Sequence, residues 1–158
     1  MRTHWPRWAF ASFSKHFANQ FAADPPPHLF VEGDDRDTAR KKDFAEFRMD
    51  GPRIREMSKG YFRLYIPVNI LVQSTMDSRD THRIYRSVGK AVAAFTDTIA
   101  IYKLGTDPVI DDSTQLVCMT LIKDKLNELK VNHFGQVDTT TRLQQATVEG
   151  HYEGFITE

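Results

Sequence analysis

Cysteine is almost absent from this sequence, and that absence excludes two classes of small protein. Cys118 is the one cysteine in 158 residues, so no disulfide can form within the chain. A structural zinc site built from several thiolates is excluded for the same reason. We expect a chain of this length to fold around one apolar core, as a soluble protein of a reducing compartment.

Long apolar runs and net charge are lacking as well. No stretch approaches the roughly 18–20 apolar residues of a membrane-spanning helix, and the first residues have no signal-peptide core, so we expect no membrane partner. The 21 basic and 21 acidic residues give a formal charge of zero. That balance argues against a domain whose main work is to neutralise nucleic-acid phosphates, although it allows a local basic patch.

The sequence also lacks the motifs of common catalytic and phosphate-binding sites. Gly-x-Ser-x-Gly, His-Glu-x-x-His and glycine-rich phosphate loops do not occur. The acid pairs Asp34-Asp35 and Asp111-Asp112 have no calcium-loop spacing around them, so we interpret them as solvated turn residues. We therefore expect a protein that is not an enzyme and has no metal and no cofactor. An enzyme site assembled from distant residues, such as His133 and Asp111, is the remote alternative.

The clearest positive feature is an alternating stretch at residues 61–72. Every even position from Phe62 to Val72 is apolar, whereas the odd positions are mixed. Side chains alternate between the two faces of a strand, so this pattern predicts a long strand with one fully apolar face. Pro67 cannot donate to a β-ladder, which predicts a free edge or a bulge there. A second alternating stretch, at 145–156, is its natural partner.

Two helices are predicted beside this strand. Residues 6–23 carry a stripe of phenylalanines and end at the proline-rich linker 24–27. We favour packing of this helix on the chain's own sheet over a partner-facing role. Residues 80–95 carry the cleanest helical stripe, which is predicted to cover the even face of the long strand. The candidate N-caps of this helix are Asp77, Ser78 and Asp80.

Shorter strands complete the expected sheet. They are predicted at 28–32, 43–49, 53–57, 98–103, 115–122 and 129–137. Turn signals stand at Asp50-Gly51-Pro52 and at Ser58-Lys59-Gly60, and the second predicts a hairpin of 53–57 against 61–66. The stretch 115–122 is apolar enough to be buried on both faces, with Cys118 acting as a small hydrophobe.

These elements predict an α+β fold in a single domain of residues 1–158. Its expected architecture is a mixed, largely antiparallel β-sheet with a long central hairpin. The N-terminal helix and one mid-chain amphipathic helix cover the sheet, and residues 28–158 form the α+β core.

A basic and aromatic cluster follows the predicted hairpin. Its members are Arg53, Arg55, Lys59, Tyr61, Arg63 and Tyr65. Basic residues interleaved with aromatic rings are typical of surfaces that bind single-stranded nucleic acid. The same residues on an exposed strand also keep an edge soluble or pair with acids on a neighbouring subunit. The residues alone leave both interpretations open.

The order of elements resembles a known family. The resemblance is carried by the sequences Val31-Glu32-Gly33, Glu46-Phe47-Arg48-Met49-Asp50-Gly51-Pro52, Tyr61–Val72 and Thr147-Val148-Glu149-Gly150-His151-Tyr152. In this order the chain is similar to the small neck and tail-completion proteins of tailed bacteriophages, most nearly the tail terminator group. A head-closure or connector-type neck protein is the alternative within the same resemblance.

The resemblance implies a structural virion protein, made in the bacterial host cytoplasm and located at the tail–head junction. Such subunits form a ring, typically a hexamer, that caps the tail tube and joins it to the connector or stopper protein. Genomic DNA passes through the lumen without sequence readout, and the family offers no catalytic residue to carry over. The implied subunit-interface or lumen surface comprises Arg53, Arg55, Lys59, Arg63 and Tyr65.

Overall fold

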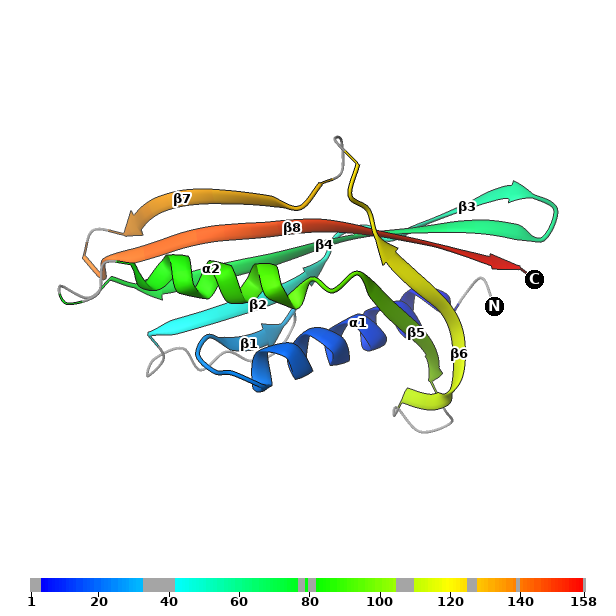
Figure 1. Cartoon of the computed structure of the whole chain (residues 1–158), viewed down its shortest axis with the longest axis horizontal. Helices are drawn as coiled ribbons and strands as arrows, with labels where there is room; N and C mark the ends of the chain where they lie inside the picture. Colours follow the sequence, from blue (N-terminus) through cyan, green and yellow to red (C-terminus); the bar gives the residue numbers. More distant parts are fainter. Residues whose placement is uncertain are drawn as a thin grey trace.

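The computed structural model describes residues 4–32, 42–76, 79, 82–104, 110–124, 128–138 and 140–157. Within these ranges the chain is α+β, with two helices and an eight-stranded sheet (Figure 1). The elements are α1 (Trp5–Ala22), β1 (His28–Val31), β2 (Asp43–Met49), β3 (Arg53–Ser58), β4 (Tyr61–Thr75), α2 (Arg83–Ala94), β5 (Thr98–Leu104), β6 (Ile110–Leu121), β7 (Lys130–Asp138) and β8 (Leu143–Thr157).

The sheet is built on the pairing of β4 with β8. These two strands pair along their whole length, from Tyr61 opposite Thr157 to Thr75 opposite Leu143. The full strand order is β1-β2-β4-β8-β6-β5, while β3 also pairs with β4 and β7 also pairs with β8. Only β1 and β2 run parallel, so the predicted mixed, largely antiparallel sheet is confirmed. The predicted partnership of the two alternating stretches is confirmed as well.

The segment Asp50-Gly51-Pro52 is a bulge, and the prediction of a turn there was wrong. β2 and β3 lie end to end along the same side of β4, with Met49 opposite Val68 and Arg53 opposite Tyr65. The chain therefore passes through this segment without reversing. Gly51 has φ +51°, a conformation that glycine adopts at bulges as readily as in turns, so composition alone could not separate the two.

Pro67 faces this bulge, which confirms the second of the two alternatives predicted for it, a free edge or a bulge. Its carbonyl accepts a hydrogen bond of 3.1 Å from the backbone N–H of Asp50. In an antiparallel strand the N–H and C=O of one residue point to the same side, so the missing N–H of Pro67 also faces the irregular segment. The β4–β8 ladder on the other side is left intact, with Pro67 opposite His151.

The apolar core lies between the even face of β4 and the two helices. All six even-numbered residues from Phe62 to Val72 are buried. Phe17 of α1 stacks on Phe47 of β2 at 5.3 Å between ring centroids and meets the edge of Phe95 at 5.2 Å. The N-terminal helix thus packs on the chain's own sheet, as predicted.

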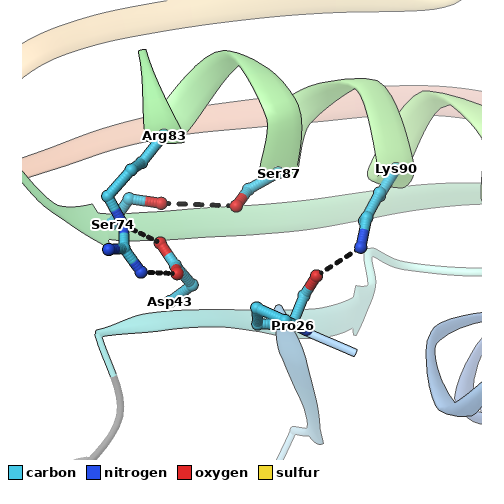
Figure 2. Close-up of polar contacts among 6 residues, drawn as sticks. All are labelled: Pro26, Asp43, Ser74, Arg83, Ser87 and Lys90. Atoms are coloured by element: carbon cyan, nitrogen blue, oxygen red, sulfur yellow. Dashed lines mark hydrogen bonds and ion pairs between the residues drawn. The ribbon is translucent and has the colours of Figure 1, made fainter. Parts of the chain in front are cut away.

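α2 covers the same face, and polar contacts fix its first turns (Figure 2). Arg83 donates to the carboxylate of Asp43 at the start of β2, with Nε 3.3 Å from Oδ1, and both side chains are largely buried. Ser74 donates to Ser87 at 3.4 Å, and Lys90 donates to the carbonyl of Pro26 at 2.7 Å. These contacts join α2 to β2, β4 and the proline-rich linker.

The N-cap of α2 differs from the residues expected from the sequence. Asp77, Ser78 and Asp80 lie outside the described residues. The residue at the N-cap is His82, and its side chain makes no capping hydrogen bond. The Asp43–Arg83 pair takes over the role of fixing the helix start, and sequence spacing gave no sign of it because 40 residues separate the two partners.

β6 differs from its prediction in length and in burial. The strand begins at Ile110, so Asp111-Asp112 belongs to a strand rather than to the expected loop. Val117 and Met119 are buried, whereas Cys118 between them is exposed. The prediction of burial on both faces was therefore wrong, as was the buried role for Cys118. When only one face of a strand is covered, successive side chains alternate between buried and exposed, even if the residues on both faces are apolar.

Gly150 of β8 lies in close contact with the buried ring of Phe95. A Cβ placed on Gly150 would lie 2.6 Å from Cε1 of Phe95, whose ring also packs against Phe17 and Tyr152. This contact explains the glycine that the sequence places inside a predicted strand.

Replacing Gly150 with valine is therefore expected to lower the free energy of unfolding by about 1–3 kcal/mol, because the new side chain overfills a packed core. Gly89→Ala is the matched control, since nothing lies within 4 Å of its added Cβ. In an exposed turn of α2 that change is expected to stabilise by about 0.5–1 kcal/mol. Chemical denaturation measures both, and equal effects would contradict the tight contact at Gly150.

Candidate functional site: the odd face of the hairpin arm

The sheet extends into an arm at the end where the β3–β4 hairpin and the C-terminus lie (Figure 1). We call residues 53–66 and 153–157 the arm. Within it β4 is central, with β3 on one side and the end of β8 on the other. Phe62, Leu64 and Ile156 point to the core and are buried. The opposite, odd face of the arm carries the residues singled out from the sequence.

Strand register brings four of the five predicted residues together. Arg53 lies directly opposite Tyr65, and Arg55 lies directly opposite Arg63. Directly opposed side chains share a face of the sheet, so these four project to the same side. They line a hollow of about 310 Å³, which we call the arginine groove. Lys59 lies apart from them, exposed in the turn between β3 and β4.

The arginine groove gathers like charges. Arg55 and Arg63 face each other across two strands, an arrangement that is destabilising unless an anion compensates it. Arg63 donates from Nε to Glu153 of β8 at 2.9 Å. Burial raises the pKa of Tyr65, against the opposing effect of the positive charges of Arg53 and Arg63, and the negative charge of Asp124 raises it further.

The tip of the arm is apolar and exposed. The rings of Tyr61 and Phe155 stack at 5.6 Å with an interplanar angle of 4°. Large apolar side chains exposed on the arm are Ile54, Met57, Tyr61 and Phe155. Phe155 was missed from the sequence, although one signal was present: it is an aromatic residue on the otherwise polar face of the predicted C-terminal strand. Glu153 was likewise not singled out.

An acidic cluster lies beside the arm, where β1 meets β2. Glu46 accepts a hydrogen bond of 3.1 Å from Arg48. This bond, together with the charges of Glu46, Glu32 and Asp50, raises the pKa of Arg48 despite partial burial. We call Glu32, Glu46 and Asp50 the acidic cluster. Within this cluster Glu46 is buried, whereas Glu32 and Asp50 are exposed.

The remote alternative, a site joining His133 to Asp111, gains no support from the topology. His133 lies on β7, where its ring stacks on Tyr85 of α2 at 5.4 Å. Asp111 lies in the first residues of β6, and β6 and β7 are not paired in the sheet. Strand pairing therefore does not place His133 beside Asp111.

Among the residues placed in the structure, no group of three or more His, Cys, Asp or Glu side chains has the geometry to hold a metal ion. Among the same residues, neither helix is long and apolar enough to span a membrane. No protein-family model matches the chain, and no curated protein matches it.

Proposed function

We propose that this chain is a structural subunit of a ring at the neck of a tailed phage, most nearly a tail terminator. The observation that carries the proposal is the arm, which extends from a fold whose core is already covered by its own helices. The arm displays an exposed aromatic tip and an excess of positive charge. Both are properties of a surface that meets another macromolecule.

The open edges of the sheet support assembly. Among the described residues, β1 ends the strand order on one side, and β3 and β7 each pair with a single strand. At the other end of the order, α1 takes part of β5, where the backbone N–H of Tyr102 donates to Ser12. An unpaired edge is a template for contact with another chain. When one subunit's arm contacts a different surface of the next subunit, the contact is heterologous, and repetition around an axis closes a ring. A hexamer is the ring size that the family resemblance favours.

The phage assignment rests on the order of elements along the chain. A helix, a short strand, a long hairpin, a second helix and a terminal alternating strand stand in the order that the neck and tail-completion proteins share. In this role the ring caps the tail tube, contacts the connector or stopper protein, and lets DNA pass through its lumen without readout. The role needs no catalytic residue, and a head-closure or connector-type subunit is the alternative within it.

Immunogold labelling of virions from a phage that encodes this chain tests the assignment. The expected result is label confined to the junction of head and tail. Label elsewhere on the particle would contradict the neck role and indicate another structural role in the virion. Label on host material with none on virions would overturn the virion assignment. The neighbouring reading frames give an independent check, since tail-tube, connector or tape-measure genes are expected beside this one.

A second candidate is a nucleic-acid-binding module, and one observation favours it. The arginine groove places Tyr65 among three guanidiniums, an arrangement that suits a phosphate backbone beside a stacked base. This candidate requires an affinity for single-stranded DNA that falls steeply with salt. Fluorescence anisotropy across a salt series decides the matter, and a flat salt dependence or no binding at low salt removes the candidate.

A further inference from the structure

We propose that the hollow between α1 and the outer edge of β5 binds a short extended peptide segment of a partner protein. The hollow has a volume of about 350 Å³, at the lower end of the range for ligand pockets. The peptide lies beside β5 as a further strand, a mode of binding in which backbone hydrogen bonds supply the affinity. This inference goes beyond the proposed ring and does not depend on it. The walls of the hollow include Ser12, His16 and Asn19 of α1, and Thr98, Ala100 and Tyr102 of β5.

The outer edge of β5 points its backbone groups toward this hollow. Directly before β5, the carbonyl of Asp97 accepts a hydrogen bond of 2.8 Å from the N–H of Leu121, so Asp97 points its backbone groups toward β6. This direction alternates along an antiparallel strand, so Ala100 and Tyr102 point their N–H and C=O groups away from β6. The N–H of Tyr102 does point away, because it donates to Ser12 of α1 at 3.0 Å.

Ala100 has an N–H and a C=O on this edge that its neighbours do not use. Ser12 accepts from Tyr102, and the hydroxyl of Thr96 donates to the carbonyl of Thr98 at 3.0 Å. In the described part of the chain β5 pairs with β6 alone, and no hydrogen bond joins the outward groups of Ala100 to another residue. A peptide residue placed opposite Ala100 exchanges both hydrogen bonds with it, as in any antiparallel pair.

The stretch of β5 that faces the hollow is a suitable template for a further strand. From Thr98 to Ile101 it stays in continuous register with β6, and register shifts begin only after Ile101. Ile99 and Ile101 are buried in the core, so this edge is held in place before a peptide binds. An edge that is already ordered lowers the entropy cost of binding.

The same contacts limit the length and the chemistry of the peptide. The hydrogen bond between Ser12 and Tyr102 closes one end of the edge, so the paired stretch is about two or three residues long. Ser12 accepts from Tyr102 and keeps its own hydroxyl proton to donate to the peptide. Asn19 lies exposed on the same wall and offers an amide. We therefore expect a polar side chain on the peptide where it faces α1.

A selection from a library of short random peptides, with the full chain as bait, supplies the probe. The selected peptide is synthesised and titrated into the isotope-labelled chain, and binding is followed by NMR. The expected result is a shift of the amide signals of Thr98 and Ala100, with slower hydrogen exchange at Ala100. Methylation of the peptide nitrogen that pairs with the carbonyl of Ala100 is expected to weaken binding at least about tenfold, because it removes the donor.

Ala100→Pro tests the same contact from the side of the chain. The substitution removes the N–H that points into the hollow and leaves the β5–β6 ladder intact, and proline is tolerated on a sheet edge. It is expected to weaken peptide binding at least about tenfold. Ala100→Ser is the matched control, which keeps the N–H and is expected to bind normally.

The methylated peptide is tested on the original chain, so the proposal stays testable even if the proline variant fails to fold. Three results overturn it. The first is a library from which no peptide binds, and the second is a set of shifts away from Thr98 and Ala100. The third is a methylated peptide that binds as tightly as its parent, because backbone pairing with β5 would then contribute nothing.

Discussion

Replacing Phe17 with alanine is expected to lower the free energy of unfolding by about 3–5 kcal/mol, the usual range for a fully buried phenylalanine. Phe17 has no exposed surface. Its ring contacts Phe47 of β2 and Phe95 at the end of α2, at 5.3 Å and 5.2 Å between centroids. The substitution therefore opens a cavity where α1, α2 and the sheet meet. Urea denaturation followed by circular dichroism measures the loss.

Phe10→Ala is the matched control on the same helix. Phe10 is only partly buried and meets Phe47 at the longer centroid distance of 6.0 Å. Its loss is expected to be about 1–2 kcal/mol, since less apolar surface leaves water on folding. A cost below about 1 kcal/mol for Phe17→Ala would contradict the docking of α1 on its own sheet, because no cavity would then have formed.

Replacing Asp43 with alanine is expected to lower the free energy of unfolding by about 3 kcal/mol. The substitution removes the carboxylate that holds Arg83 at the start of α2 (Figure 2). The guanidinium is left without this partner in a site where its side chain keeps only 19% of its surface exposed. Breaking a buried pair is costly because the remaining charge has lost both water and its counter-ion. Thermal unfolding monitored by calorimetry measures the effect.

Asp97→Ala provides the comparison for this pair. Asp97 also forms an ion pair, with Lys123, but both side chains are mostly exposed. An exposed pair contributes about 0–1 kcal/mol, so this substitution is expected to be almost neutral. Adding Arg83→Met to Asp43→Ala is expected to recover part of the loss, because it removes the buried charge that Asp43 no longer balances. Equal effects of Asp43→Ala and Asp97→Ala would contradict the role of the buried pair in fixing α2.

Much of the fold was predictable because the spacing of apolar residues along the sequence indicates strands and helices. The alternation from Phe62 to Val72 located the central strand, and the stripes of residues 6–23 and 80–95 located both helices. Four of the five predicted surface residues came together because a short hairpin fixes its own register. Local patterns of this kind predict a helix or strand correctly wherever one of its faces is buried and the other is exposed.

Features that depend on distant neighbours were not predictable in the same way. Asp50-Gly51-Pro52 has the composition of a turn, and only the shared partner β4 shows that the chain continues straight through it. The exposure of Cys118 was not predicted, because the apolar sequence of β6 does not indicate which face of the strand is left uncovered. The acidic cluster escaped notice because the parallel pairing of β1 with β2 assembles it from separate segments.

The mass of the purified chain in solution tests the central claim most directly. Sedimentation equilibrium at low salt, over a wide range of concentrations, distinguishes a closed assembly from a monomer. Six copies of an 18.2 kDa chain give 6 × 18.2 kDa, about 109 kDa. We expect the chain to converge on one discrete species of that size as its concentration rises. A single species of 18.2 kDa at every concentration would contradict the proposed ring and the surfaces assigned to it.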